Sequence, residues 1–300
     1  MAKGVQRMEN KVTLVLDSQS ALGEGPHWDH KQNRLYWVDI IGKKLHIYNP
    51  KKNDNHTIQF EQFIGAAVPE QSGELLLAMQ NGVYRYNMDT NQLTKLHDPE
   101  EDKINNRFND GKCDSMGRFW VGTMDLDGKK DCGSLYRLDV DGKITKVLSP
   151  VSISNGIAWS PDKKFMYFID TPTHKVSTYH YEESTGNISY FGTGVEIPED
   201  MGSPDGMTID EEGMIWVAHW GGAMVSRWNP HNGDLLDTIK IPAKNVTSCT
   251  FGGENLDELF ITTARTGLSE EDLVAYPQSG GLFKVEPGVK GLPANYYGRK

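Results

Sequence analysis

A strand-rich repeat of forty to fifty residues runs along this chain and constrains its fold more than any other feature. Six apolar, strand-like segments have equivalent central residues, which are Tyr36, Leu76, Trp120, Tyr167, Trp216 and Phe260. Successive centres lie 40, 44, 47, 49 and 44 residues apart. A period of this length, with strands in every unit, is typical of the blades of a β-propeller.

Each repeat unit has room for four strands. In the unit that begins near Asn155, aromatic and β-branched residues fill the segments SNGIAWS, FMYFIDT, KVSTYHYEE and ISYFGTGVEI, while Gly, Pro, Asn and Asp occupy the joints. No stretch keeps a 3.6-residue period, and we expect the acidic segments 98–104 and 268–276 to be loops. We therefore predict an all-β fold, a six-bladed β-propeller with four-stranded blades, as one domain over residues 1–300.

The two ends of the chain carry strand-like segments that suit ring closure. Residues 11–17 read KVTLVLD and residues 281–287 read GLFKVEP. A propeller that does not close leaves an exposed sheet edge, which folded proteins avoid. We predict that these two segments lie in one blade and join the ends of the chain.

Four turn-like peptides place a polar residue at nearly the same offset before a strand. They are LGEGP with Glu24, RFNDG with Asn109, ISNGI with Asn155 and SPDGM with Asp205. The polar residue lies 12, 11, 12 and 11 positions before the strand centre. Because the inner strands of a propeller line a central channel, these four side chains should form a ring at one mouth. The other two blades offer small residues near this level, at 65–66 and around Ser248.

The composition of this ring points to a metal site. Two carboxylates and two amide oxygens suit a hard divalent cation such as calcium, magnesium or manganese. Without a cation, Glu24 and Asp205 would repel each other, and the pKa of one should rise. Each peptide taken alone is also an ordinary turn former, but turn chemistry does not require polar side chains in a shared register.

Further polar residues stand close to the predicted mouth. Arg107 precedes Asn109 by two positions and should face the same side, where it suits a hydroxyl-rich or anionic substrate. The alternative is a surface arginine paired with an acidic residue at 100–102. Asp125 and Asp127 follow what we take to be another inner strand, so they either reach the mouth or are solvated loop residues.

Charge and cysteine content narrow the function classes. The net charge is −10, from 31 basic and 41 acidic residues without a basic cluster, which argues against nucleic acid and anionic membranes as partners. No apolar run approaches the roughly 20 residues of a membrane span. The N-terminal MAKGVQRMENK lacks the apolar core of a signal peptide, so we expect a cytoplasmic protein. We also expect a monomer or a weak homo-oligomer. Three cysteines without a CxxC pair predict neither a disulfide framework nor a cysteine zinc site.

Longer segments carry a family resemblance. LGEGPHWD, NNRFNDGKCDSMGRFWVGTM, PDGMTIDEEGMIWVAHWGG and SGGLFKVEPGVKGLP occur in this order, and through them the chain resembles the SMP-30/gluconolactonase/LRE-like family from residue 22 to 298. The resemblance implies a six-bladed propeller with one divalent metal ion at the channel mouth. Ca²⁺ is the ion we expect first, and Zn²⁺, Mn²⁺ and Mg²⁺ are the alternatives. The resemblance also implies metal ligands at Glu24, Asn155 and Asp205, substrate contacts at Arg107, Asn109 and Asp127, and a general base at Asp205. The loop after Asp127, DLDGKKDCGS, is shorter than in the animal members, which leaves the role of Asp127 open.

The function implied is that of a lactonase, a carboxylic ester hydrolase that opens a sugar lactone to the hydroxy acid. The metal would polarise the carbonyl group, and Asp205 would take a proton from the attacking water. Because ligation lowers the basicity of Asp205, a hydroxide on the metal is an alternative base. Three alternatives stay open at this point: a calcium-binding regulatory propeller without catalysis, a hydrolase of aryl esters or phosphotriesters, and a propeller that binds protein.

Overall fold

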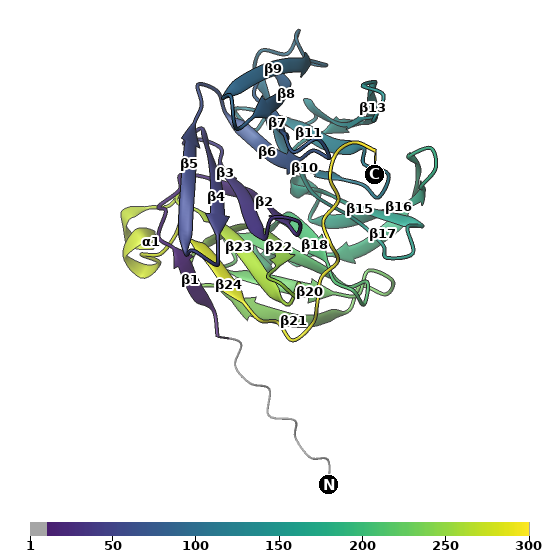
Figure 1. The fold of residues 1–300 in the computed structure, drawn as a ribbon. Coiled ribbons are helices and arrows are strands. Elements are labelled where there is room, and N and C mark those ends of the chain that lie inside the picture. Colours follow the sequence, from purple (N-terminus) through teal and green to yellow (C-terminus); the bar gives the residue numbers. More distant parts are fainter. Residues whose placement is uncertain (1–10, 300) are drawn as a thin grey trace.

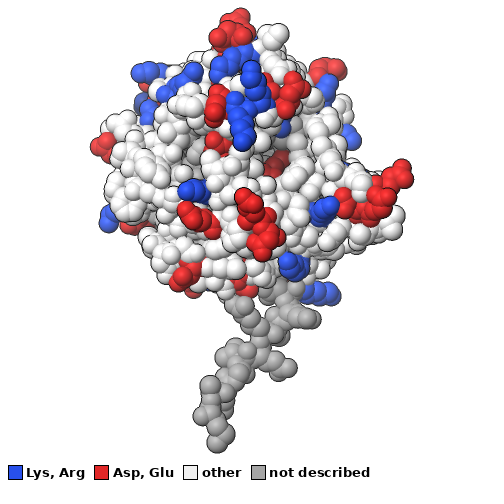
Figure 2. Space-filling model, turned by 180° about the vertical axis from the view of Figure 1, so that it is seen from behind, with Lys and Arg blue, Asp and Glu red and all other residues white. Residues whose placement is uncertain are grey.

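Residues 11–299 are described by the computed structural model, and their strands form six four-stranded antiparallel sheets arranged in a ring (Figure 1). The innermost strand of each sheet packs against the innermost strands of its neighbours, so that six strands enclose a central channel. This arrangement confirms the predicted six-bladed β-propeller. Lys, Arg, Asp and Glu side chains are interspersed over the face seen in Figure 2, as the dispersed charges of the sequence suggest.

The blades follow one another along the chain, and each begins with the strand nearest the channel and extends outward. The first three blades consist of β2 (Gly23–Asp29), β3 (Arg34–Asp39), β4 (Lys44–Asn49) and β5 (Asp54–Gln59); β6 (Ile64–Pro69), β7 (Leu75–Met79), β8 (Gly82–Asn87) and β9 (Gln92–His97); and β10 (Asn106–Cys113), β11 (Phe119–Asp125), β12 (Gly133–Leu138) and β13 (Ile144–Val151). The last three consist of β14 (Ser154–Trp159), β15 (Phe165–Asp170), β16 (Lys175–Glu182) and β17 (Asn187–Glu196); β18 (Ser203–Ile209), β19 (Ile215–Trp220), β20 (Met224–Trp228) and β21 (Leu235–Lys240); and β22 (Asn245–Gly252), β23 (Glu258–Ala264), β24 (Leu282–Val285) and β1 (Thr13–Leu16).

The last blade combines both ends of the chain. β1 pairs antiparallel with β24, with Thr13 opposite Lys284 and Leu14 opposite Phe283. The N-terminal strand therefore supplies the outer edge of a blade whose other three strands come from the C-terminal part. This pairing confirms the predicted ring closure.

The six predicted strand centres occupy one structural position. Each lies in the second strand of its blade and is at most 1% exposed. Tyr36 pairs with His27 of the inner strand, Trp120 with Lys112, and Trp216 with Thr208, so the centres also mark one level along the channel. These large side chains form part of the apolar layers between blades. Their burial stabilises the fold by roughly 25 cal/mol for each Å² of apolar surface removed from water.

A β-bulge interrupts each inner strand near the level of the predicted ring. The regular pairing shifts between Glu24 and His27, Ile64 and Ala66, Phe108 and Gly111, Ser154 and Ile157, Pro204 and Met207, and Val246 and Ser248. A bulge inserts an extra residue and redirects the side chains beside it. The repeat in the sequence therefore encodes a repeated bulge, and the four polar residues stand on it. Gly25, directly after Glu24, has a φ of +53°, a conformation that residues with a Cβ seldom adopt.

The expectation of a loop over 268–276 is wrong, because α1 (Glu270–Ala275) forms a short helix there. Ser269 and Asp272 form a capping box, and three acidic residues in the first turn favour the helix N-terminus. The segment 98–104 is a turn, as predicted. Two short 3₁₀ helices, η1 (Thr171–Thr173) and η2 (Glu199–Met201), complete the described helices, and none of them is long and apolar enough to cross a membrane.

Residues 290–298, which we call the C-terminal strap, run across the end of the channel where the inner strands finish (Figure 1). The strap is hydrogen-bonded to the turns of several blades. Its backbone bonds join Gly291 to Leu256, Tyr297 to Pro69 and Gln71, and Gly298 to Gly117. The Tyr296 hydroxyl donates to the buried carboxylate of Asp29 at 2.7 Å. The strap therefore covers this end of the channel.

Candidate active site

The four predicted ring residues come together at one mouth of the channel. Glu24, Asn109 and Asn155 are each 5% exposed and Asp205 is 6% exposed. Asn109 Nδ2 donates to Asn155 Oδ1 at 3.0 Å, which links adjacent blades. Glu24 and Asp205 share a side-chain hydrogen bond. Four residues that are 46 to 85 positions apart in the chain thus come together in one polar group.

The two carboxyl groups of the ring are strongly perturbed. Burial raises the pKa of Glu24 to about 8, and the charge of Asp110 adds to this rise. Burial also raises the pKa of Asp205 well above its usual range, and the charge of Glu24 acts in the same direction. The expected rise is confirmed, although desolvation contributes more than the repulsion we foresaw. A divalent cation that bound these two carboxyl groups would displace their protons into the solvent.

Asn155 has a fixed orientation in the ring. Its Nδ2 donates to Thr171 Oγ1 at 2.7 Å, and Thr171 Oγ1 donates to the carbonyl oxygen of Pro204 at 2.9 Å. Pro204 directly precedes Asp205, so this chain of bonds connects two ring residues through η1. The bonds to Thr171 and Asn109 fix both ends of the Asn155 amide, whose Oδ1 keeps one lone pair beyond the bond from Asn109.

Arg107 lies beside the ring and is 8% exposed. Its Nη1 donates to Asn109 Oδ1 at 2.6 Å and to the carbonyl oxygen of Phe108 at 3.0 Å. Burial lowers the pKa of Arg107 to about 10, although the charges of Glu24 and Asp205 oppose that change. Its Nε and Nη2 make no hydrogen bond within residues 11–299, so donors are left for a ligand. The alternative of a surface arginine paired with an acidic residue at 100–102 is therefore wrong.

Asn109 holds Arg107 and Asn155 rather than presenting a free oxygen. Its Oδ1 accepts from Arg107, and its Nδ2 donates to the carbonyl oxygen of Ser154 at 2.8 Å as well as to Asn155. The sequence pattern treated all four ring residues alike. The hydrogen bonds distinguish them, because Asn109 Oδ1 accepts from the charged guanidinium group of Arg107, whereas Asn155 Oδ1 accepts from the neutral amide of Asn109 and Glu24 Oε2 from the backbone N–H of Gly25.

Asp125 ends β11, the second strand of its blade, and Asp127 comes two residues later, so the expectation that they follow an inner strand is wrong. Asp125 is buried and accepts the backbone N–H groups of Asp127 and Lys129, so it organises this loop. Asp127 is exposed and accepts from Asn105 Nδ2 at 3.1 Å. No ring residue contacts Asp127 in these hydrogen bonds, and its contact with substrate stays a prediction.

Sequence reasoning missed residues that position the ring. Asp39 accepts the backbone N–H groups of Ala21 and Leu22, just before Glu24. Asp170 accepts those of Ser152 and Ile153, just before Asn155. A signal existed, because RLYWVD and FMYFID both end in Asp three residues after the strand centre.

A third buried carboxyl group lies next to the ring. Asp110 follows Asn109 and is 4% exposed. Its Oδ1 accepts the backbone N–H of Gly111 at 2.8 Å, while its buried Oδ2 has no partner among the described residues. Burial raises the pKa of Asp110. The channel interior near the ring is therefore rich in carboxyl oxygens.

The donor set of the ring fits a hard divalent cation. Within residues 11–299 no cluster of three or more His, Cys, Asp or Glu side chains has the arrangement of a metal site, which leaves an amide oxygen as the third protein donor. Glu24, Asp205 and Asn155 supply oxygen only, which suits calcium, magnesium or manganese better than a thiolate-seeking metal. A divalent charge would also compensate the two crowded carboxylates.

A cavity of about 280 Å³ lies at the other mouth of the channel, and no ring residue lines it. Its walls come from the later part of the inner strands and from the strap. The perturbed carboxyl groups and the free donors of Arg107 lie at the ring and not in this cavity.

Residues 22–265 match the SMP-30/gluconolactonase/LRE-like region. A relative from Bacillus subtilis named "Putative sugar lactone lactonase YvrE" is 41% identical over 273 residues, which is 91% of this chain and 94% of the relative. Regucalcin of Xenopus laevis is 38% identical over 288 residues, 94% of this chain and 96% of the relative. The solved structure of a luciferin-regenerating enzyme superposes with a TM-score of 0.92 and 34% identity, over 96% of this chain and 99% of that one. On these matches, the chain belongs to the SMP-30/gluconolactonase/LRE-like family.

Proposed function

We propose that this protein is a divalent-metal-dependent lactonase that opens a sugar lactone, of the aldonolactone class, to the hydroxy acid. The observation that carries the proposal is the pairing of Glu24 and Asp205, two buried adjacent carboxyl groups, beside an oriented amide oxygen on Asn155. The sugar lactone lactonase among its relatives supports the same reaction class.

Glu24, Asn155 and Asp205 would hold the metal ion, for which calcium is the first choice. When bound, a divalent cation supplies a Lewis acid that polarises the lactone carbonyl and stabilises the negative charge of the tetrahedral intermediate. The chain supplies the remaining groups of the reaction.

Asp205 acts as the general base. In the reacting state its carboxylate is ionised and accepts one proton from the water whose oxygen attacks the carbonyl carbon. The bond between that carbon and the ring oxygen then breaks, and Asp205 returns the proton to the leaving ring oxygen, which becomes a hydroxyl group. General-base assistance of this kind contributes about 10²–10⁴-fold in rate.

Arg107 binds the hydroxyl groups or the developing carboxylate of the sugar through its Nε and Nη2 donors. Asn109 keeps the guanidinium group in place through the 2.6 Å bond to Nη1. Asp127, on the exposed loop after β11, contributes a contact at the rim of the site. Thr171 keeps Asn155 oriented and contacts neither substrate nor reacting atoms.

The proposal is tested with a panel of five- and six-membered aldonolactones, with an aryl ester and a phosphotriester as further substrates. The purified protein is assayed separately with Ca²⁺, Mg²⁺, Mn²⁺ and Zn²⁺, after subtraction of spontaneous lactone hydrolysis. We expect the highest kcat/KM on an aldonolactone. Preference for the aryl ester or phosphotriester would replace the substrate class, and tight calcium binding without turnover of any substrate would identify a binding propeller instead.

A further inference from the structure

The covered mouth of the channel is a second ring built by the same repeat. Three residues after Glu24, Asn109, Asn155 and Asp205 the inner strands carry His27, Lys112, Ala158 and Thr208, and these residues pair with the equivalent strand centres. All four line the cavity of about 280 Å³, together with Thr250 of β22. The bulge between the two levels accounts for side chains three positions apart both facing the channel.

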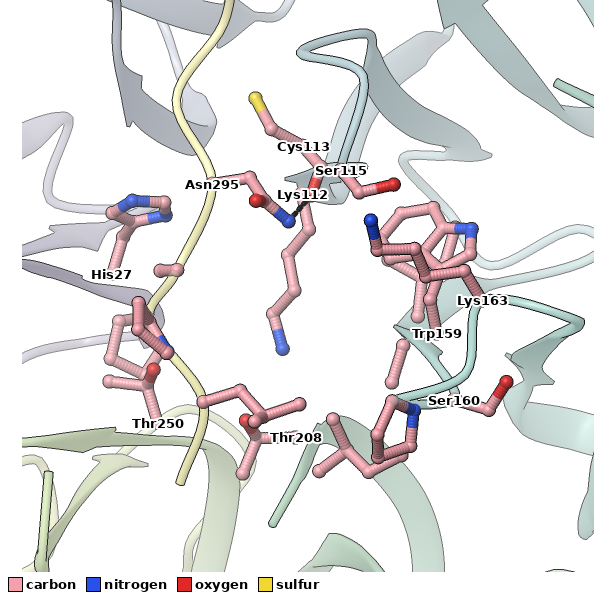
Figure 3. Close-up of a pocket in the computed structure, with 18 residues that line it drawn as sticks. His27, Lys112, Cys113, Ser115, Trp159, Ser160, Lys163, Thr208, Thr250 and Asn295 are labelled. Atoms are coloured by element: carbon pink, nitrogen blue, oxygen red, sulfur yellow. Dashed lines mark hydrogen bonds between the residues drawn. The ribbon is translucent and has the colours of Figure 1, made fainter. Parts of the chain in front are cut away.

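Lys112 places a cation in the middle of this cavity. Figure 3 shows its side chain extending from β10 into the space between His27, Thr208 and Trp159. Its Nζ donates to the carbonyl oxygen of Met207 on β18. Within residues 11–299 it forms no ion pair closer than 4.0 Å, although an ammonium group carries three N–H donors. A partly buried lysine without a carboxylate partner is unusual.

The lining of the cavity is free of negative charge. Among its eighteen described lining residues there are two lysines and no Asp or Glu, in a chain whose net charge is −10. The second lysine, Lys163, already pairs with Glu183 at the rim at 2.6 Å. On the channel side, the charge of Lys112 acts on the carboxyl group of Asp110. Burial raises the pKa of Asp110, and the charge of Lys112 only partly opposes this rise. His27 supplies no charge, because burial lowers its pKa to about 3.

The walls offer further donors and an apolar surface. Thr208 and Thr250 contribute hydroxyl groups to the walls, and Asn295 contributes a side-chain amide (Figure 3). The Trp159 ring, Ile157 and Leu292 provide apolar contact. A volume of about 280 Å³ is at the lower end for ligand pockets, so the ligand must be small.

We propose that the covered mouth binds a small organic carboxylate with a flat, apolar body. The carboxylate accepts charge-assisted hydrogen bonds from Lys112, and the body lies against Trp159 beneath the C-terminal strap. This binding site is independent of the metal ring, since the two levels present different residues of the same strands.

The test uses 4-fluorobenzoate as the probe in fluorine NMR titrations of the full-length protein. We expect saturable binding to the wild type, at least tenfold weaker binding of the neutral 4-fluorobenzamide, and at least tenfold weaker fluorobenzoate binding to Lys112→Met. Lys52→Met, which removes an exposed lysine outside the cavity, is the matched control and should bind like the wild type. Trp159→Phe should bind more weakly than the wild type while keeping its fold.

Two results would overturn the proposal. One is equal binding of the acid and the amide, or the absence of saturation at concentrations up to about 10 mM. The other is loss of binding in Arg107→Met with full binding in Lys112→Met, which would place the probe at the metal ring. If Lys112→Met does not fold, wild-type crystals soaked in 4-iodobenzoate decide: iodine anomalous density beside Trp159 supports the proposal, and density only at the ring or nowhere contradicts it.

Discussion

The two mouths of the central channel are made by the same six strands but differ in charge and in cover. At one mouth Glu24 and Asp205 crowd two carboxyl groups together, and Arg107 is the neighbouring cation. At the other mouth Lys112 stands in a cavity lined by no carboxylate among its described residues, beneath the strap. A three-residue step along each strand is enough to separate them. The repeat therefore fixes where side chains point, and the residue type at each level decides the chemistry.

The largest expected effect is a loss of lactonase activity that occurs on substitution at the polar ring and not at the covered mouth. Asp205→Asn removes the base and one oxygen donor, so kcat/KM on an aldonolactone should fall by at least about 10³-fold. Tyr296→Phe, a change at the other mouth, should leave that kcat/KM within twofold of wild type. Steady-state kinetics of both variants at saturating metal check this prediction. Retained turnover in Asp205→Asn would remove Asp205 from its assigned role.

A smaller effect is expected from Thr171, which touches the ring only through Asn155. Thr171→Val removes the hydroxyl that accepts from Asn155 and donates to Pro204, so the amide loses its fixed orientation. We expect metal affinity to fall by about 10–100-fold, as for other residues that orient a ligand. Calorimetric titration with Ca²⁺ measures this, and Thr171→Ser should restore most of the affinity. Equal affinities for the valine variant and the wild type would exclude a positioning role.

Thr171 illustrates what the sequence does and does not reveal. The blade count, the closing strands and the four ring residues are encoded by a repeat, so spacing alone locates them. The contacts of Thr171 and Asp110 are not repeated from blade to blade, so no periodicity in the sequence indicates them. The helix α1 spans only six residues, too few to show a periodic pattern, although the capping box of Ser269 and Asp272 is readable in the sequence.

The strap and the cavity could not be predicted from the sequence, for a different reason. Residues 290–298 have no strand or helix pattern, and their hydrogen-bond partners lie in distant turns, from Leu256 to Gly117. No pattern in the sequence singles out Lys112, and only the bulge in β10 places it in the channel. Local patterns carry little information about such irregular, long-range contacts.

The strap offers a test by stability rather than activity. In Tyr296→Phe the fully buried Asp29 loses the 2.7 Å bond from the tyrosine hydroxyl, and the backbone N–H of Lys31 loses its bond to the same oxygen. Asp29 Oδ1 keeps its bonds from the backbone N–H groups of Lys31 and Gln32, so the free energy of unfolding should fall by about 1.5–3 kcal/mol, the usual contribution of one hydrogen bond to a charged group. Urea denaturation measures it. An unchanged unfolding midpoint would show that the bond between Tyr296 of the strap and Asp29 does not stabilise the propeller.

The smallest expected effect is the pH dependence of the metal-free protein. The pKa of Glu24 is about 8 in the folded chain against an ordinary value of 4.5, so the folded state binds this proton more tightly than the unfolded state. Its contribution to stability is complete below pH 4.5 and is lost as the pH rises through 8. We expect Tm to decrease by roughly 2 °C or more from this group between about pH 5 and 8.

The control for this pH effect is Glu24→Gln, which has no proton to lose at this position and should show a smaller decrease in Tm. Calcium-saturated wild type should also show a smaller decrease, because the bound cation favours the ionised carboxylate. A decrease of the same size in all three samples would mean that other groups cause it.

The most direct test of the central claim is the rate of aldonolactone opening before and after removal of divalent metal. The protein is treated with EDTA, freed of the chelator, and assayed alone and with Ca²⁺, Mg²⁺, Mn²⁺ or Zn²⁺ added back, with spontaneous hydrolysis subtracted. We predict that metal-free protein loses at least about 100-fold in kcat/KM and that one of these ions restores it, since the cation stabilises the charge formed during attack. Full activity in the metal-free protein would contradict a metal-dependent lactonase at the ring of Glu24, Asn155 and Asp205.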